Sequence, residues 1–374
     1  MSAQPRIALV HDWLTGMRGG EKALEVLCER YPKATLFTLF HARGQVSAQI
    51  ERLRPRRSVV QWLPMARRYY RQYLPLFPFV IEQFDLDAYD LVISTSHCAA
   101  KSVVVPGRGR HLCYCHSPMR YAWDQYSAYF GPERLGRLRS RAVRPLVAAL
   151  ARWDARTAGR VDRFVANSRH VARRIGRYYN RRAAVVYPPV DTAFYHPDDT
   201  TPGDYFLMVS ALVPYKRIDV AIQACEMLGA RLRIVGQGPE HARLRSLAGD
   251  QVEFLGRLPD EQVRAQYRSA AAVLLPGEED FGIAPVEAQA CGRPVVALAR
   301  GGALETVEPG VSGILVAQDT PEAFADGLEA ARRTPFDPAA IRTRALRFSR
   351  ERFAAAIEAH IQETLGAPAE AVRW

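Results

Sequence analysis

Short apolar runs alternate with longer amphipathic stretches through the second half of the chain. The apolar runs predict strands at residues 205–210, 231–235, 252–255, 272–275, 294–298 and 313–316. Stretches with helical spacing follow them, beginning near Arg217, Glu240, Asp260, Ala284 and Pro321. Regular alternation of strands and helices predicts a parallel, doubly wound sheet with helices on both faces.

The first half shows the same alternation with longer insertions. Strands are predicted at residues 6–12, 35–40, 91–95, 111–116 and 163–168, and a helix over 19–31 follows the first of them. A long helix is predicted over 133–157 with Leu138 and Leu146 among its apolar positions, and Pro145 inside it predicts a kink or a break. The fold class expected is therefore α/β, with two Rossmann-like doubly wound domains facing across a cleft.

The boundary between the halves is marked by residues 185–191, which contain Pro188-Pro189 and end the first half, and by the polar run 197–203, which has no periodicity. A chain of 374 residues is too long for one ordinary core, which fits two domains. We expect a first domain over residues 1–190 and a second over 191–347. The remaining residues, 348–374, are expected to form a helix that packs back on the first domain.

Charge is divided unevenly between the halves. The formal net charge is +12, but residues 1–187 carry 32 Lys and Arg against 13 Asp and Glu, and residues 188–374 carry 19 against 26. A basic first domain indicates a polyanion or an anionic surface as its partner. Residues 52–84 mix arginines with aromatic side chains, a pattern that suits a membrane interface, single-stranded nucleic acid or an ordinary solvated face.

Composition narrows the class of protein. An apolar share of 48% with 24% charged residues is typical of a globular protein. The six cysteines are scattered without zinc-ligand spacing and are expected to be reduced thiols of a cytoplasmic protein. The start of the chain has no secretory signal, and no apolar run approaches the roughly 18 residues that a spanning helix needs.

Polar residues with candidate chemistry follow several predicted strands. Glu279 follows the strand at 272–275, and Glu287 lies one turn inside the next helix, whose first N–H groups are free to bind an anion or a sugar oxygen. Lys216 and Arg217 follow the strand at 205–210, where two cations could stabilise a leaving diphosphate. Acids at a helix start and cations on a surface also have purely structural explanations.

Glycine turns and one histidine complete the candidate residues. Gly19-Gly20 and the turn Gly236-Gln237-Gly238 each follow a predicted strand, and such turns let a phosphate or nucleotide approach the backbone. His116 leaves a strand in a polar turn and could hydrogen-bond a sugar hydroxyl or balance a phosphate. Ordinary tight turns and a structural histidine are the alternatives. All these residues follow strands, and ligands of open α/β sheets bind at that edge, which predicts one shared cleft.

The spacing of the acidic loop resembles a known family. Glu279-x-Phe281-Gly282, four further residues and Glu287-Ala288 resemble the signature of glycosyltransferase family 4, retaining enzymes of the GT-B architecture. Matching segments are His11-Asp12-Trp13 with Gly19-Gly20-Glu21, and residues 115–123, 187–191, 210–219, 235–239 and 279–292. Within the family, the chain is similar to bacterial mannosyltransferases that assemble O-antigen and exopolysaccharide.

The resemblance implies roles for individual residues. His116, Lys216 and Glu279 would be catalytic, with His116 beside the transferred sugar, Lys216 on the diphosphate and Glu279 on the sugar hydroxyls. The donor would be bound by Gly19, Gly20, Arg217, Gly236, Gly238, Arg257, Leu258, Phe281, Gly282, Ile283 and Glu287, the last of them on the ribose. The acceptor would be bound by Asp12, Trp13, Arg120, Tyr121 and Trp123. Many members carry an arginine where this chain has Ala211, and whether Arg217 replaces that arginine stays open.

The resemblance also implies a reaction. We expect a retaining transfer of mannose from GDP-mannose to a lipid-linked saccharide by front-face displacement, peripherally on the inner face of the plasma membrane. No cofactor or metal is expected, and no Asp-x-Asp cluster lies near the predicted cleft. The expected partners are the nucleotide sugar, the lipid-linked acceptor and an anionic membrane surface, without nucleic acid. A UDP-sugar donor, a GT-B relative that is not a transferase and a basic nucleic-acid-binding protein stay open as alternatives, as does the oligomeric state.

Overall fold

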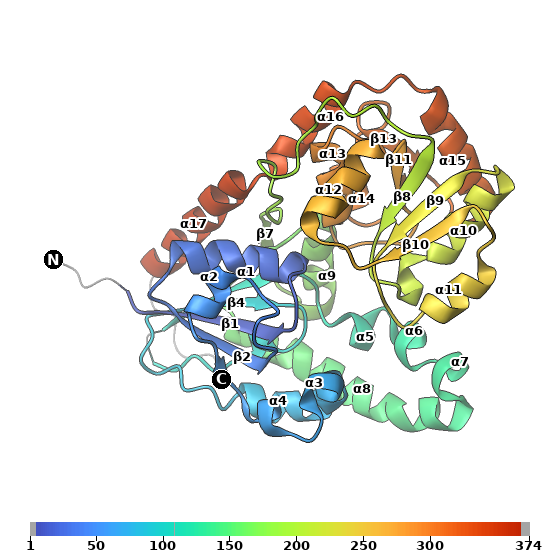
Figure 1. Cartoon of the computed structure of the whole chain (residues 1–374). Coiled ribbons are helices and arrows are strands. Elements are labelled where there is room, and N and C mark those ends of the chain that lie inside the picture. The colour runs from blue at the N-terminus through green and yellow to red at the C-terminus, as the bar shows by residue number, and fades with distance from the viewer. Residues whose placement is uncertain (1–4, 108, 368–374) are drawn as a thin grey trace. The chain divides into compact units, whose positions relative to one another are not determined.

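The computed structural model describes residues 5–107 and 109–367, and it divides the chain into two compact units (Figure 1). The first unit contains Met1–Pro189 together with Phe353–Trp374, and the second contains Val190–Arg352. The chain therefore passes from one unit to the other twice. Each unit is built on one parallel sheet with helices on its faces.

The first unit holds a seven-stranded sheet in the order β3-β2-β1-β4-β5-β6-β7. Its strands are β1 Ile7–Leu14, β2 Thr35–His41, β3 Arg56–Arg57, β4 Leu91–Ser96, β5 Arg110–Cys115, β6 Arg163–Ala166 and β7 Ala183–Val185. The five strands predicted from sequence are confirmed. The two edge strands, β3 and β7, were not predicted, because β3 consists of two exposed arginines and β7 is a three-residue part of an apolar run that leads directly into the proline-rich boundary.

Helices cover both faces of this sheet. They are α1 Gly19–Arg30, α2 Ala48–Arg52, α3 Ala66–Tyr69, α4 Phe77–Ile81, α5 Arg120–Trp123, α6 Tyr126–Phe130, α7 Pro132–Leu135, α8 Arg137–Thr157, α9 Arg169–Tyr179 and α17 Arg350–Gly366, with short 3-10 turns η1 Val59–Trp62, η2 Tyr70–Leu76, η3 Ala100–Ser102 and η4 Ala158–Arg160. Alternate residues of β1 enter the two cores: Leu9 packs with α1 and α17, and Val10 packs with α4 and α8. Phe353, Ile357 and Ile361 of α17 are buried in the first of these cores.

The long helix predicted over 133–157 is broken, but not at Pro145. The break lies at Gly136, whose φ of +77° separates α7 from α8, and α8 continues through Pro145. Pro145 and Arg141 are exposed, so the carbonyl that loses its donor can be hydrated. Leu138 is 86% exposed and Leu146 is also exposed, so the prediction that these two residues face a core is wrong.

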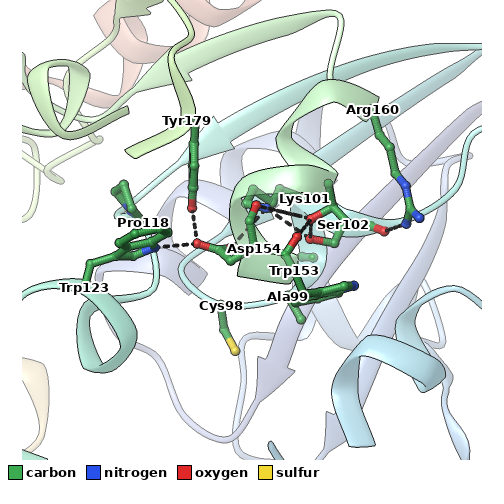
Figure 2. A network of polar contacts seen from close by, with 12 residues as sticks. Cys98, Ala99, Lys101, Ser102, Pro118, Trp123, Trp153, Asp154, Arg160 and Tyr179 are labelled. Carbon is green, nitrogen blue, oxygen red and sulfur yellow. Dashed lines mark hydrogen bonds and ion pairs between the residues drawn. The ribbon is translucent and has the colours of Figure 1, made fainter. Parts of the chain in front are cut away.

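A buried ion pair fixes α8 to its neighbours (Figure 2). Lys101 Nζ lies 3.0 Å from Asp154 Oδ1 and donates hydrogen bonds to the Asp154 carbonyl at 2.6 Å and to Thr157 Oγ1 at 3.1 Å. Asp154 Oδ2 accepts from Trp123 Nε1 and from the Tyr179 hydroxyl, each at 2.8 Å. The network ties η3, α5 and α9 to α8, and its lysine and aspartate are fully buried.

The second unit holds a six-stranded parallel sheet in the order β10-β9-β8-β11-β12-β13. Its strands are β8 Tyr205–Val209, β9 Arg231–Val235, β10 Val252–Gly256, β11 Ala272–Leu275, β12 Val295–Leu298 and β13 Gly313–Val316, which confirms all six predicted strands. Its helices are α10 Ile218–Met227, α11 His241–Leu247, α12 Asp260–Ser269, α13 Ile283–Ala290, α14 Ala303–Thr306, α15 Pro321–Arg333 and α16 Pro338–Ala345, with 3-10 turns η5 Pro214–Lys216 and η6 Leu346–Phe348.

Both sheets reverse their strand order beside their first strand. In the first unit the reversal lies between β1 and β4, and in the second it lies between β8 and β11. Open parallel sheets bind ligands beyond the carboxyl ends of the strands at such a reversal. The segments that follow these four strands are therefore the places to examine. Within the part of the chain described, none of the helices has the length and apolar content to cross a bilayer.

Candidate functional site

Lys216 and Glu279 meet at the reversal of the second sheet. Lys216 ends η5, in the segment after β8, and Glu279 follows β11, the neighbouring strand. The Lys216 ammonium forms an ion pair with the Glu279 carboxylate, and their side chains are only 16% and 11% exposed. The two catalytic residues predicted in this half therefore lie together. An anion that reaches Lys216 has to compete with Glu279 for it.

The acidic loop leads into α13. Gly282, at φ +89°, precedes the helix, which begins at Ile283 and has Pro285 in its first turn, as predicted. Phe281 is buried and packs edge-on against Phe348, with ring centroids 5.3 Å apart. The aromatic contact anchors the loop, so the backbone N–H groups at the helix start have a fixed position.

A glycine pair that the sequence analysis did not single out supports this loop. The Gly302 N–H donates to the Glu279 carbonyl at 2.8 Å. A Cβ on Gly302 would lie 2.4 Å from Phe281 Cα, and a Cβ on Gly301 would lie 2.2 Å from the Glu279 carbonyl oxygen. Only glycine fits at either position. The signal was present as a glycine doublet just after a predicted strand.

Glu287 is buried within the second unit. Its side chain sits in α13, the residue is 5% exposed, and Oε2 accepts a hydrogen bond from the Tyr267 hydroxyl at 3.1 Å. Tyr267 is fully buried. Oε2 of the Glu287 carboxylate is therefore engaged inside the unit. The predicted contact with a ribose hydroxyl has to use the remaining lone pairs of this carboxylate.

Arg217 is neutralised by carboxylates of its own unit. Its guanidinium pairs with Asp319 and lies 3.5 Å from the Asp219 carboxylate. This pairing disfavours Arg217 as the replacement for the arginine missing at Ala211, because a cation bound by two carboxylates offers little net charge to a diphosphate, and its role in donor binding stays a prediction. The Asp319 contact joins residues 102 positions apart, which is why the adjacent sequence gave no sign of it.

The glycines after β9 are required by a contact within the chain. A Cβ on Gly236 would lie 1.8 Å from the Ser210 carbonyl oxygen, and a Cβ on Gly238 would lie 2.2 Å from the Leu212 carbonyl oxygen. These glycines therefore let the turn after β9 pack on the segment after β8, and a nucleotide contact stays a prediction. Arg257 and Leu258 follow β10, at the same edge of the sheet.

Three histidines gather at the reversal of the first sheet. His11 lies in β1, His97 follows β4, and His116 follows β5, with His97 ring centroids 6.0 Å from His11 and 6.5 Å from His116. A Cβ on Gly20, in the first turn of α1 beside Gly19, would lie 3.4 Å from His11 Cε1 and 3.5 Å from His116 Nε2. The predicted residues Gly20 and His116 are therefore close together, and His97 joins them. His97 was not among the residues predicted from sequence, although it leaves a strand in the same way as His116.

Asp12 is a buried anchor for the segment that carries His97. The residue has no exposed surface and accepts the backbone N–H groups of His97, Cys98, Ala99 and Ala100 at 2.6–2.9 Å. Asp12 Oδ2 also lies 3.2 Å from His97 Nδ1. The predicted role in acceptor binding stays a prediction, and in this structure the Asp12 side chain has no exposed surface. Burial raises the pKa of Asp12, and the N–H donors oppose that rise by stabilising the charged carboxylate, so Asp12 can orient the imidazole through Nδ1–H.

Burial decides the charge of this cluster. Burial lowers the pKa of His11 to about 3, and burial together with Arg71, Arg18 and Arg120 lowers the pKa of His97 to about 3. Both imidazoles are therefore neutral near pH 7. Burial also raises the pKa of Glu21 to about 7. No group of three or more His, Cys, Asp or Glu side chains in residues 5–107 and 109–367 is placed to hold a metal ion.

The aromatic residues predicted to bind an acceptor are packed within the first unit. Trp13 is buried and meets the His97 ring edge-on, with centroids 4.4 Å apart. The Tyr121 hydroxyl lies 2.7 Å from Cys98 Sγ, and Trp123 stacks on Tyr178 while its N–H binds Asp154. Arg120 begins α5 beside them. The polar atoms of Tyr121 and Trp123 are thus used inside the unit, which leaves ring surface for an acceptor.

Comparison with known proteins agrees with the two-unit architecture. Residues 17–194 match the model of Glycosyltransferase Family 4, and residues 197–346 match that of Glycosyl transferases group 1. The D-inositol 3-phosphate glycosyltransferase of Mycobacterium avium is 31% identical over 309 residues, covering 70% of this chain and 71% of that protein. The D-inositol 3-phosphate glycosyltransferase of Acidothermus cellulolyticus is 34% identical over 226 residues, which cover 48% of this chain. The chain spans about half (50%) of the length of that relative.

Solved structures extend the likeness to the whole fold. HepE of Anabaena in complex with UDP and glucose has a TM-score of 0.70 at 19% identity, covering 96% of this chain and 100% of that one. The lipopolysaccharide outer core galactosyltransferase WaaB has a TM-score of 0.66 at 16% identity, covering 96% and 99%. These likenesses identify the fold as GT-B. Since both halves match family models and the M. avium relative is covered over more than two thirds of its length, the chain belongs to glycosyltransferase family 4.

Proposed function

We propose that the chain transfers a sugar from a nucleotide-sugar donor, and the observation that carries this proposal is the ion pair between Lys216 and Glu279 at the β8/β11 reversal. A bound diphosphate takes over Lys216 as its counter-ion. Glu279 is then released to accept hydrogen bonds from the donor sugar. The charge that develops on the diphosphate as the glycosidic bond breaks is stabilised by a cation already in position.

The reaction proposed retains the anomeric configuration. The diphosphate leaves, and its own oxygen removes the proton of the incoming hydroxyl on the same face of the sugar. Glu279 is engaged with Lys216 and Glu287 with Tyr267, so neither is placed as half of a hydrolase-type carboxylate pair. This chain's residues bind, orient and neutralise, and the donor supplies the base.

His97 is proposed as a contact for the acceptor hydroxyl. A neutral imidazole that donates Nδ1–H to Asp12 leaves Nε2 as a hydrogen-bond acceptor. The ring is held between the Asp12 carboxylate and the edge-on Trp13 ring. Its partner at the same sheet edge is His116, the residue predicted to lie beside the transferred sugar.

The donor proposed is GDP-mannose, on the resemblance to O-antigen and exopolysaccharide mannosyltransferases. A UDP-sugar is the second candidate, favoured by the likeness to HepE, which was solved with UDP-glucose. The acceptor proposed is a lipid-linked saccharide at the inner face of the plasma membrane. It is supported by the basic first half and by exposed apolar side chains of the first unit, among them Val59, Trp62, Phe79 and Leu138.

A thermal-shift panel of GDP, UDP, GDP-mannose, UDP-glucose and UDP-N-acetylglucosamine tests the donor. We expect GDP and GDP-mannose to raise the melting temperature, because a ligand that binds the folded state increases the free energy of unfolding by RT ln(1 + [L]/Kd). A Lys216→Ala variant should lose the response while its circular dichroism spectrum shows that it is still folded. A response to the uracil nucleotides alone would replace GDP-mannose by a UDP-sugar, and no response to any nucleotide would refute the proposal.

A further inference from the structure

The first unit contains a hollow that the candidate site does not use. It has a volume of about 370 Å³ and lies at the carboxyl end of β2, one strand away from β1. Its lining combines three arginines, Arg43, Arg57 and Arg67, with the apolar residues Phe40, Leu63 and Met65. The carboxyl edge of a parallel sheet is where ligands of this fold class bind, so the position of the hollow suits a binding site.

The charge of the hollow is uncompensated. Arg43, Arg57 and Arg67 have no carboxylate partner among the described residues, and the Arg57 guanidinium lies 5.4 Å from the centroid of the Trp62 ring. The nearby carboxylate of Glu51 is already bound to His41 Nε2 at 3.1 Å and to the Gly44 N–H at 2.7 Å. Three cations around one hollow repel one another, and an anion bound between them removes that repulsion.

Two exposed apolar side chains lie at the hollow. Met65, which belongs to its lining, is 60% exposed, and Trp62, whose ring lies beside the guanidinium of Arg57, is 75% exposed. Met65 adopts φ +52°, a left-handed conformation that costs an unbranched non-glycine residue free energy and that concentrates at ligand-binding segments. Met65 thus exposes an apolar side chain to solvent beside a cationic hollow. An anion with a long apolar tail requires a surface that combines these two features.

We propose that this hollow binds the phosphate group of an amphiphile, with Arg43, Arg57 and Arg67 on the phosphate and Trp62 and Met65 against the apolar chain. The site deepens the proposed function, on which it rests, by giving the lipid-linked acceptor or the surrounding acidic lipid a defined anchor. Arginine suits this task because its planar guanidinium donates two parallel hydrogen bonds to phosphate oxygens. Single-stranded nucleic acid fits less well, because Met65 in the lining cannot stack on a base, whereas strand-binding proteins stack successive bases on aromatic side chains.

The test compares vesicle binding of the full chain with that of a triple variant, Arg43→Lys with Arg57→Lys and Arg67→Lys. Lysine keeps the charge and loses the bidentate geometry, so bulk attraction to an anionic surface is unchanged. The matched control is Arg137→Lys with Arg139→Lys and Arg141→Lys on the exposed start of α8. Vesicles consist of phosphatidylcholine with phosphatidylglycerol, with a polyprenyl diphosphate, or with a fatty acid at equal surface charge.

We expect the hollow variant to bind phosphate-bearing vesicles on the order of 10²-fold more weakly, since three lost bidentate contacts at about 1 kcal/mol each add to roughly 3 kcal/mol, and about 1.4 kcal/mol is a factor of ten. Binding to fatty-acid vesicles should be unchanged, and the α8 control should resemble the parent on all three. A loss confined to polyprenyl diphosphate assigns the hollow to the acceptor carrier, and an equal loss with phosphatidylglycerol assigns it to bilayer lipid. Equal losses in both variants, no loss at all, or a loss seen only with a single-stranded oligonucleotide would each overturn the proposal.

Donor binding separates this proposal from the proposed function. The hollow variant should keep the same nucleotide-induced thermal shift as the parent. A parent chain with no shift for any nucleotide would refute the transferase proposal, while the vesicle result would still decide the phosphate site.

Discussion

The two units treat charge at their sheet edges in opposite ways. In the second unit, Lys216 is paired with Glu279, and Arg217 with Asp319, so cations and carboxylates compensate each other before any ligand arrives. In the first unit, Arg43, Arg57 and Arg67 have no such partner among the described residues. A compensated edge selects a ligand that can exchange partners with a specific ion pair. An uncompensated edge attracts any anion, and its selectivity has to come from shape and hydrogen-bond geometry.

The largest effect is expected on stability, at the buried ion pair between Lys101 and Asp154 in the interior of the first unit. Lys101→Met should lower the free energy of unfolding by about 3–5 kcal/mol, because the Asp154 carboxylate stays buried without its cation. Denaturant unfolding followed by circular dichroism measures the loss. The double variant Lys101→Met with Asp154→Leu should lose less than the single one. A single variant within 1 kcal/mol of the parent would mean that the ion pair does not hold α8.

The next effect compares two adjacent cations of the second unit. Lys216→Ala should lower turnover on the order of 10²-fold or more, since it removes the cation that faces the leaving diphosphate. Glu279→Ala should act in the same direction. Arg217→Ala should lower turnover less than about tenfold, because that guanidinium is already bound by Asp219 and Asp319. Equal losses at positions 216 and 217, measured with saturating donor, would contradict the separate assignments.

The smallest effect is a pH dependence in the first unit. The folded-state pKa of Glu21, about 7, lies above its ordinary value of 4.5, so the fold binds this proton more tightly than the unfolded chain does. The free energy of unfolding should therefore fall, on the order of 2 kcal/mol, as pH rises from about 4.5 to about 7. Glu21→Gln has no proton to lose there and should lack this part of the fall.

Thermal unfolding at pH 5 and pH 8 measures the difference between the parent and Glu21→Gln. Glu25→Gln on the same helix is the matched control, since its side chain is only partly buried. The explanation fails if both variants and the parent lose the same stability between the two pH values.

The sequence predicted what buried apolar runs and local turns determine. The six strands of the second unit were found because each contains a short apolar run, and nearly all residues of β8 and β11 are buried. Lys216 and Glu279 were found because each follows one of these two strands. That the two residues touch depends on β8 and β11 being neighbours, which follows from the doubly wound topology. Sequence patterns therefore suffice for the edge of the second sheet.

The contacts that the sequence did not reveal share a physical cause, which is that the partners lie on distant loops. Asp12 finds its four N–H donors 85–88 residues away, and Arg217 finds Asp319 102 residues away. Neither contact leaves a local pattern. Gly136 breaks the long helix because a left-handed residue ends it, whereas Pro145 is tolerated in water. To predict from sequence that the helix breaks at Gly136 and not at Pro145, one has to know which turn of the helix is exposed to solvent.

The double passage of the chain between the units has a consequence for synthesis on the ribosome. Phe353, Ile357 and Ile361 complete a core whose other members lie before residue 187. Val190–Arg352 is made before them, so the unit that is started first is finished last. During elongation, one face of the sheet that contains β1 lacks its contacts with α17 while the second unit folds. The apolar surface exposed there is the kind of surface that chaperones bind. A fragment that ends at Arg352 should retain the second unit and aggregate through the first.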